Sequence, residues 1–195
     1  SGVAILGFNI DRQSYKHTAK KSDAEKSSTK KAILNKDFRQ AITFALNREN
    51  YSAQVNGKEF AKPAIRNTYV APAFVQVDGK DFGNVVADKL TTYGDQWKGI
   101  NLEDGQDGLY NKDKAKAQLE KAKAELQKDG VQFPIHIDVP VIQNATSIVT
   151  RMQSLKQTVE ETLGKDNVVV DLQMMDQDEV LNITLNVPSA ADADW

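Results

Sequence analysis

Apolar residues recur every three or four positions in three parts of the chain, and this spacing predicts three amphipathic helices. The first follows Asn35, the second follows Asn111, and the third begins at Asn144 or Thr146 and ends at Gly164. Asparagine and threonine side chains accept hydrogen bonds from the free N–H groups of a first helical turn. These residues are therefore expected to cap the three helices.

Two shorter helices are predicted by the same criteria. One is capped by Asn47 and ends at Gly57, and the other is capped by Asp176 and ends before Pro188. Residues 11–31 are polar and rich in lysine, which favours a solvent-exposed helix or loop over a basic binding patch.

Strands are predicted at residues 2–10, 133–141 and 168–174, where β-branched residues concentrate or alternate with polar ones. The last two strands enclose the third long helix, and a strand, helix and strand in this order form a parallel crossover. The sequence therefore predicts an α/β fold (α+β mixed sheet) flanked by helices.

The stretch 58–110 has little periodicity and is interrupted by many prolines and glycines. Loops of this length in a compact domain are usually functional or inserted, so contacts with a ligand or partner are expected here. We interpret residues 1–195 as a single partial domain that carries this loop-rich excursion. Because the chain opens directly on an apolar run without an initiator methionine, we expect a piece of a larger protein.

The composition narrows the possible functions. The sequence holds 25 basic and 27 acidic residues, a net charge of −2, and no cysteine. Disulfides, thiolate metal sites and cysteine catalysis are excluded, and no basic footprint for nucleic acid is present. No apolar run approaches the roughly 20 residues that span a bilayer, so the chain as given is expected to be soluble.

Few residues form a pattern suited to catalysis, metal or nucleotide binding. His136 and Asp138 share one face of a predicted strand, which would suit a peptidase or a metal site, but no second histidine lies near in sequence. We interpret them as a half-buried surface pair. No glycine-rich nucleotide motif or serine elbow is present. We expect no catalytic residue, no metal and no cofactor.

Arg66, Tyr69 and Phe74 lie close together in the loop-rich stretch, around Pro63 and Pro72. A guanidinium pairs with carboxylates, and an exposed ring covers apolar side chains, so Arg66 and Tyr69 are candidate ligand contacts. The alternative is that Tyr69 and Phe74 only anchor the loop to its own domain.

The run from Leu34 to Glu49, LNKDFRQAITFALNRE, resembles a signature of the solute-binding proteins of peptide-importing ABC transporters, with Asn47 in place of the usual aspartate. The order of elements is similar to the C-terminal lobe of that family, a periplasmic-binding-protein-like type II lobe. The run from Asp104 to Asn111 further resembles the oligopeptide-binding lipoproteins of streptococci and related Gram-positive bacteria.

This resemblance implies a non-catalytic, monomeric receptor whose two lobes enclose an oligopeptide. It implies a lipid anchor in the full-length parent, a place on the extracellular face of the cell membrane, and ABC permease subunits as partners. Gln143 and Asn144 match a family loop that can face the cleft, where a helix start offers backbone donors.

Two alternatives stay open. One is an interaction module that docks through the lysine-rich helix, which includes Lys116 and Lys123. The other is a receptor for a different ligand, such as a signalling peptide, a sugar or a nickel chelate.

Overall fold

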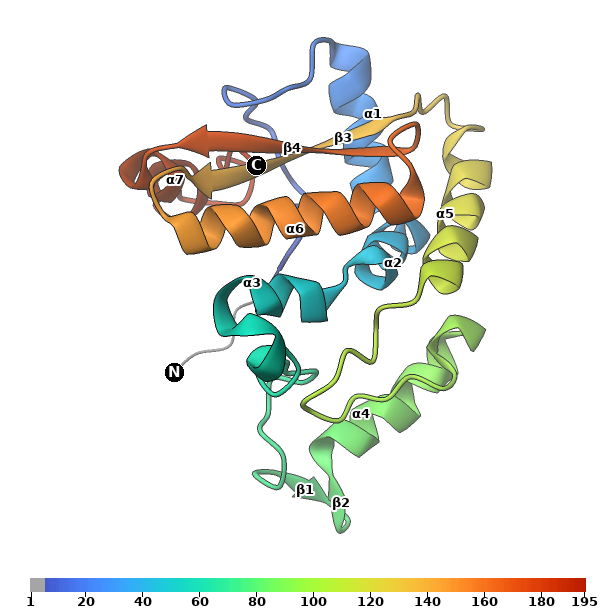
Figure 1. Ribbon diagram of the computed structural model, residues 1–195. Coiled ribbons are helices and arrows are strands. Elements are labelled where there is room, and N and C mark those ends of the chain that lie inside the picture. The colour runs from blue at the N-terminus through green and yellow to red at the C-terminus, as the bar shows by residue number, and fades with distance from the viewer. Residues whose placement is uncertain (1–5) are drawn as a thin grey trace.

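The computed structural model describes residues 6–195, and its centre is a parallel pair of strands. Strand β3 (Ile135–Ile142) pairs with β4 (Val168–Met175), and α6 (Thr146–Leu163) connects them (Figure 1). The register runs from Ile135 opposite Val168 to Ile142 opposite Met175. The predicted parallel crossover is confirmed, and with it the α/β fold class.

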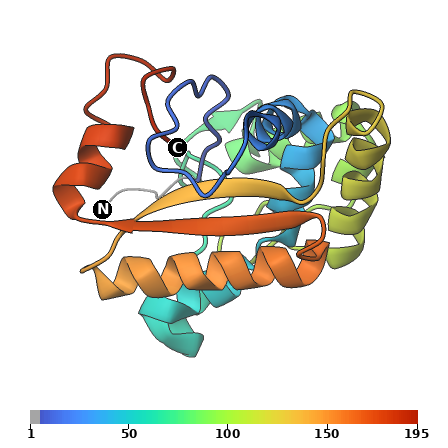
Figure 2. The same cartoon turned by 90° about the horizontal axis from the view of Figure 1, so that it is seen from above.

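The two faces of this sheet have different coverings (Figure 2). Helix α6 packs on one face, where Val159, Val168 and Val170 are buried. On the other face lie the loop 11–22, α1 (Asp23–Leu34) and α7 (Gln177–Thr184). The sheet is therefore covered by a regular helix on one face and largely by chain segments near both ends of the sequence on the other.

Three further helices extend the core beyond the sheet. Helices α2 (Lys36–Ala45) and α5 (Lys112–Leu126) pack against each other, and α3 (Arg48–Ala61) packs against α6. The predicted caps at Asn35 and Asn111 are confirmed. The side chain of Asn35 accepts from the Phe38 N–H at 3.0 Å, and that of Asn111 accepts from the Lys114 N–H at 2.9 Å.

Asn47 caps α3 in the same way, accepting from the Asn50 N–H at 2.9 Å. Gly57 breaks this helix at a positive φ of 72°, a conformation that favours glycine, and a further helical turn follows it. The predicted end at Gly57 is therefore a kink.

Several sequence-based predictions about element ends are wrong. Residues 6–9 form no strand and a turn begins at Ile10, while residues 2–5 of that predicted strand lie outside the described residues. Helix α6 begins after Ala145 without a side-chain cap, so neither Asn144 nor Thr146 caps it. Asp176 does not cap α7, because its carboxylate accepts a hydrogen bond from the Gln143 side chain instead.

The stretch 58–110 contains more regular structure than its many prolines and glycines predict. A two-stranded hairpin, β1 (Gln76–Val77) and β2 (Lys80–Asp81), leads into α4 (Phe82–Leu90). Two short 3₁₀ turns follow, at Thr91–Tyr93 and Asp95–Trp97. No residue of α4 is fully buried, and the hairpin and helix project away from the sheet (Figure 1).

The outer edge of β4 is closed by side chains of α6. The Glu160 carboxylate accepts from the Val170 N–H at 3.1 Å, and Lys156 Nζ donates to the Val170 carbonyl at 2.7 Å. Glu160 is only 4% exposed and also pairs with Lys156 Nζ at 2.5 Å. An edge strand with paired backbone groups cannot add a further strand at that point.

Replacing Glu160 by alanine is expected to lower the free energy of unfolding by about 1–3 kcal/mol, because the buried Val170 N–H loses its acceptor. Chemical denaturation followed by circular dichroism measures this. The matched control is Glu161→Ala, whose exposed side chain accepts a hydrogen bond from Gln157, and its expected effect is within about 0.5 kcal/mol. Equal effects of the two substitutions would contradict this role of Glu160.

Candidate functional site

A cavity of about 280 Å³ lies where the start of α3 meets the loop 66–69. Its polar wall carries Arg48, Arg66, Asn67 and Tyr69, and so includes two residues that the sequence singled out. The apolar wall consists of Leu6, Phe8, Ile42, Leu46 and Leu109. Charged and aromatic groups on one side and apolar groups on the other suit a ligand that carries both polar and apolar groups.

Arg48 holds the polar wall together. Its backbone N–H donates to Asp107 Oδ2 at 2.7 Å, and its Nε and Nη2 donate to Asp107 Oδ1 at 3.0 and 2.9 Å. Nη2 also donates to Asn67 Oδ1 at 2.5 Å, and Nη1 donates to the Arg66 carbonyl at 3.3 Å. One guanidinium therefore fixes the start of α3, the loop 66–69 and the loop around Asp107 in one arrangement.

Asn67 completes this scaffold from the opposite side. Its amide nitrogen donates to the carbonyls of Glu103 at 2.6 Å and Gln106 at 2.9 Å, and its backbone N–H donates to Asp104 Oδ1 at 3.2 Å. The acidic side chains at 104 and 107 are thus engaged by the chain itself. Within residues 6–195 no cluster of acidic or histidine side chains is arranged to hold a metal ion.

Arg66 and Tyr69 remain accessible on this scaffold. Arg66 Nη1 donates to the Pro63 carbonyl at 2.7 Å, and its Nε lies 3.4 Å from Asp104 Oδ2, with the side chain 46% exposed. Tyr69 is 75% exposed and Phe74 is also exposed. The alternative that these two rings anchor the loop to its own domain is wrong, because neither ring is buried.

Gln143 and Asn144 lie elsewhere, at the turn between β3 and α6. The Gln143 N–H donates to the Met175 carbonyl at 2.9 Å, and its side chain donates to Asp176 Oδ1 at 2.6 Å. Asn144 is exposed beside it. Neither residue lines the cavity of Arg66 and Tyr69, so the structure places the four sequence-predicted residues in two separate regions.

The pairing expected for His136 and Asp138 is wrong. His136 Nδ1 contacts Asp171 Oδ2 at 2.8 Å, whereas Asp138 is 5% exposed. Asp138 Oδ2 accepts from Arg12 Nη1 at 2.7 Å and from Lys20 Nζ at 2.6 Å. A stretch that the sequence predicted to be solvent-exposed therefore supplies two buried cations, because a buried carboxylate stands opposite them.

Neutral donors also converge on Asp138. It accepts from Thr18 Oγ1 at 2.7 Å, the Ala19 N–H at 2.9 Å and Gln173 Nε2 at 3.2 Å. Burial alone raises the pKa of the Asp138 carboxyl, but the hydrogen bonds from Ala19, Lys20 and Thr18 outweigh it and lower the pKa to about 2. Burial also lowers the pKa of Lys20. A carboxylate with all these donors is a structural anchor and has no free lone pair for catalysis.

Comparisons with known proteins show which proteins this chain is similar to. No protein-family model matches the chain. It is 61% identical to oligopeptide-binding protein SarA of Streptococcus gordonii over 98% of this chain, and 60% identical to AmiA of Streptococcus pneumoniae over 100% of it. The chain is a homologue of the streptococcal oligopeptide-binding proteins. AliA of Streptococcus pneumoniae is 59% identical over 98% of this chain.

The chain spans 29% of the length of SarA and 30% of the length of AmiA. A solved structure of an oligopeptide ABC transporter substrate-binding domain from Bacillus anthracis covers 84% of the chain at a TM-score of 0.53 and 21% identity. It shares the fold. No helix among the described residues is long and apolar enough to cross a membrane.

Proposed function

We propose that this chain forms one lobe of an oligopeptide-binding receptor that delivers its ligand to an ABC importer. The observation that carries the proposal is the similarity to SarA and AmiA, proteins named for oligopeptide binding, along 98% and 100% of the chain. The receptor is non-catalytic and needs no cofactor. Its ligand lies between this lobe and a second one, so neither lobe alone binds fully.

The cavity of Arg48, Arg66 and Tyr69 is the proposed contact surface for the peptide on this lobe. The Arg66 guanidinium donates through Nη1 to the carbonyls of Pro63 and Ile65 and has one long carboxylate contact through Nε, so its Nη2 is left for a peptide carboxylate or carbonyl. The exposed Tyr69 ring covers an apolar side chain of the ligand. Gln143 and Asn144 are proposed as a second, separate contact at the start of α6.

The remaining features of the receptor follow from the same proposal. We infer a place on the extracellular face of the cell membrane, a lipid anchor in the full-length protein, permease subunits as partners, and a monomer as the working unit. A receptor that accepts many peptides binds backbone and termini and leaves side chains in hydrated space.

Peptide uptake tests this function. Residues 1–195 replace the matching segment of SarA, and the chimera is returned to cells that lack SarA; 61% identity makes this exchange conservative. Import of labelled short peptides at a rate close to that of cells with SarA itself is the expected result. A folded, surface-exposed chimera that restores no uptake would contradict the proposal.

A further inference from the structure

His17 joins two acidic residues from different parts of the chain. Its Nδ1 lies 2.9 Å from Asp194 Oδ2, and its Nε2 lies 2.6 Å from Glu179 Oε1 on α7. Neutral imidazole has a single N–H, so only the protonated ring donates to both carboxylates. The geometry therefore requires a charged His17 for both contacts to be hydrogen bonds.

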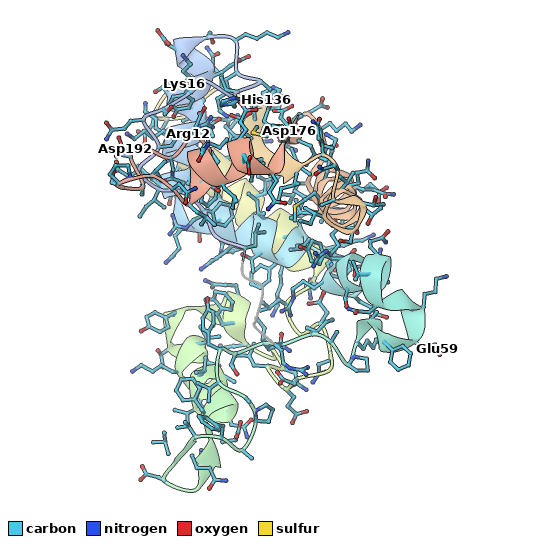
Figure 3. The ribbon with its side chains drawn as sticks, turned by 90° about the vertical axis from the view of Figure 1, so that its left-hand side faces the viewer. Arg12, Lys16, Glu59, His136, Asp176 and Asp192 are labelled. Carbon is cyan, nitrogen blue, oxygen red and sulfur yellow. The ribbon has the colours of Figure 1, made fainter. Side chains whose placement is uncertain are left out.

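These contacts belong to a seam between the loop 9–20 and the segment 179–194. The Asn9 side chain donates to the Ala190 carbonyl at 2.9 Å, and the Gln13 N–H donates to the Ala191 carbonyl at 3.2 Å. Figure 3 shows Arg12 and Lys16 of the loop in the same part of the molecule as Asp192 of the other segment. Two stretches far apart in sequence thus lie against each other above β3.

The charged groups around His17 differ in whether their charge changes near neutral pH. Asp194 from the C-terminal segment and Glu179 from α7 face the ring, and Arg12 faces Asp194 Oδ1 at 2.8 Å. Behind Arg12 lie Asp138 of β3 and Lys20. Arginine stays charged at every physiological pH, and carboxylates titrate far below neutrality. Of the groups that take part in the two ring contacts, only the His17 imidazole has an ordinary pKa near neutral pH.

We propose that His17 is a proton-dependent latch that holds α7 and the segment 185–194 against the loop 9–20. With the ring protonated, both carboxylates are bound and the seam is closed. Loss of the proton removes one donor and sets a lone pair against a carboxylate oxygen. The Glu179 contact opens first, because the Glu179 side chain is 49% exposed. Asp194, in contrast, still accepts hydrogen bonds from the Arg12 guanidinium and from the His17 backbone N–H.

The direction of the proton linkage follows from the contacts. The hydrogen bond to Asp194 is the main cause that raises the pKa of His17 above its usual 6.5, against an opposing effect of burial, and Glu179 adds to it. A raised pKa means that the latch is fully closed below about 6.5 and opens as pH rises through the raised value. The fold-change in opening equals the ratio of the acid constants of His17 in the open and closed states.

Hydrogen–deuterium exchange on the 195-residue chain tests the latch across this pH range, with rates corrected for the intrinsic pH dependence. Protection of the amides at 185–194, including the Asp194 N–H that donates to the Ile183 carbonyl, is expected to fall as pH rises. In His17→Gln the protection is lower at acidic pH and no longer varies with pH. The matched control is His136→Gln, which removes the only other histidine and keeps the wild-type pH dependence.

A second measurement needs no variant. The two histidine ring signals are followed by NMR titration in the folded and the denatured chain. His17 titrating higher in the folded chain is the expected result, and an equal or lower value overturns the latch. Protection that is independent of pH in the wild type, or equally dependent in His17→Gln, overturns it as well.

Discussion

Replacing Asp138 by asparagine is expected to lower the free energy of unfolding by about 3–5 kcal/mol, the usual cost of removing one partner from a buried ion pair. The carboxylate neutralises Arg12 and Lys20, which are both buried. The amide of asparagine has the same shape but no charge, and its nitrogen would face donors. Urea denaturation followed by circular dichroism measures the loss.

The matched control for this substitution is Asp171→Asn, which changes the residue opposite Asp138 in the sheet register. Asp171 is partly exposed and contacts His136, so a much smaller loss is expected. In the wild type, the contribution of Asp138 is full above the usual carboxyl pKa of 3.8 and is lost as pH falls towards about 2. If Asp138→Asn cost no more than Asp171→Asn, the buried cluster would not be the anchor described above.

Replacing Arg48 by alanine in the SarA chimera is expected to weaken peptide binding about 10- to 100-fold, which corresponds to about 1.4–2.8 kcal/mol. Asp107 is nearly buried and loses its fork-shaped partner, and the loop 66–69 loses the Arg48 donors to Asn67 Oδ1 and to the Arg66 carbonyl. Arg66 and Tyr69 would then no longer be held at the cavity. Calorimetry measures the affinity, and circular dichroism checks the fold.

Two further variants test whether Arg48 acts by positioning the loop 66–69 or only by its charge. Arg48→Lys keeps the charge but cannot bridge Asp107 and Asn67 in the same way, so it is expected to recover little affinity. Arg151→Ala is the control, because Arg151 stacks on Tyr51 and donates to the Ser147 carbonyl but does not line the cavity. Affinity that is unchanged in a folded Arg48→Ala chimera would remove this cavity from the ligand site.

The sequence predicted those features that depend on neighbouring residues. The caps at Asn35, Asn47 and Asn111 follow from local hydrogen bonds, and the crossover of β3, α6 and β4 follows from periodicity. Helix α4 was missed because it is short, lies among glycines and has no fully buried residue to mark its apolar face.

Features that depend on distant partners were not predictable in this way. Lys20 and Arg12 look solvent-exposed in sequence, and their partner Asp138 lies 118 and 126 positions away. For the site, Arg66 and Tyr69 stand out in an aperiodic stretch. Arg48 was missed because it directly follows the Asn47 cap and looks like an ordinary first residue of a helix. The acidic turn at 104–107 was the only local hint of a cation partner such as Arg48.

The most direct test of the receptor proposal is calorimetric titration of a mixture of short peptides into the SarA chimera and, in parallel, into the isolated chain. Saturable binding by the chimera and at most weak binding by the isolated chain are expected, because the site lies between two lobes. Comparable binding by the isolated chain would place a complete site on this lobe. A folded chimera that binds no peptide would contradict the claim that this chain is a lobe of an oligopeptide receptor.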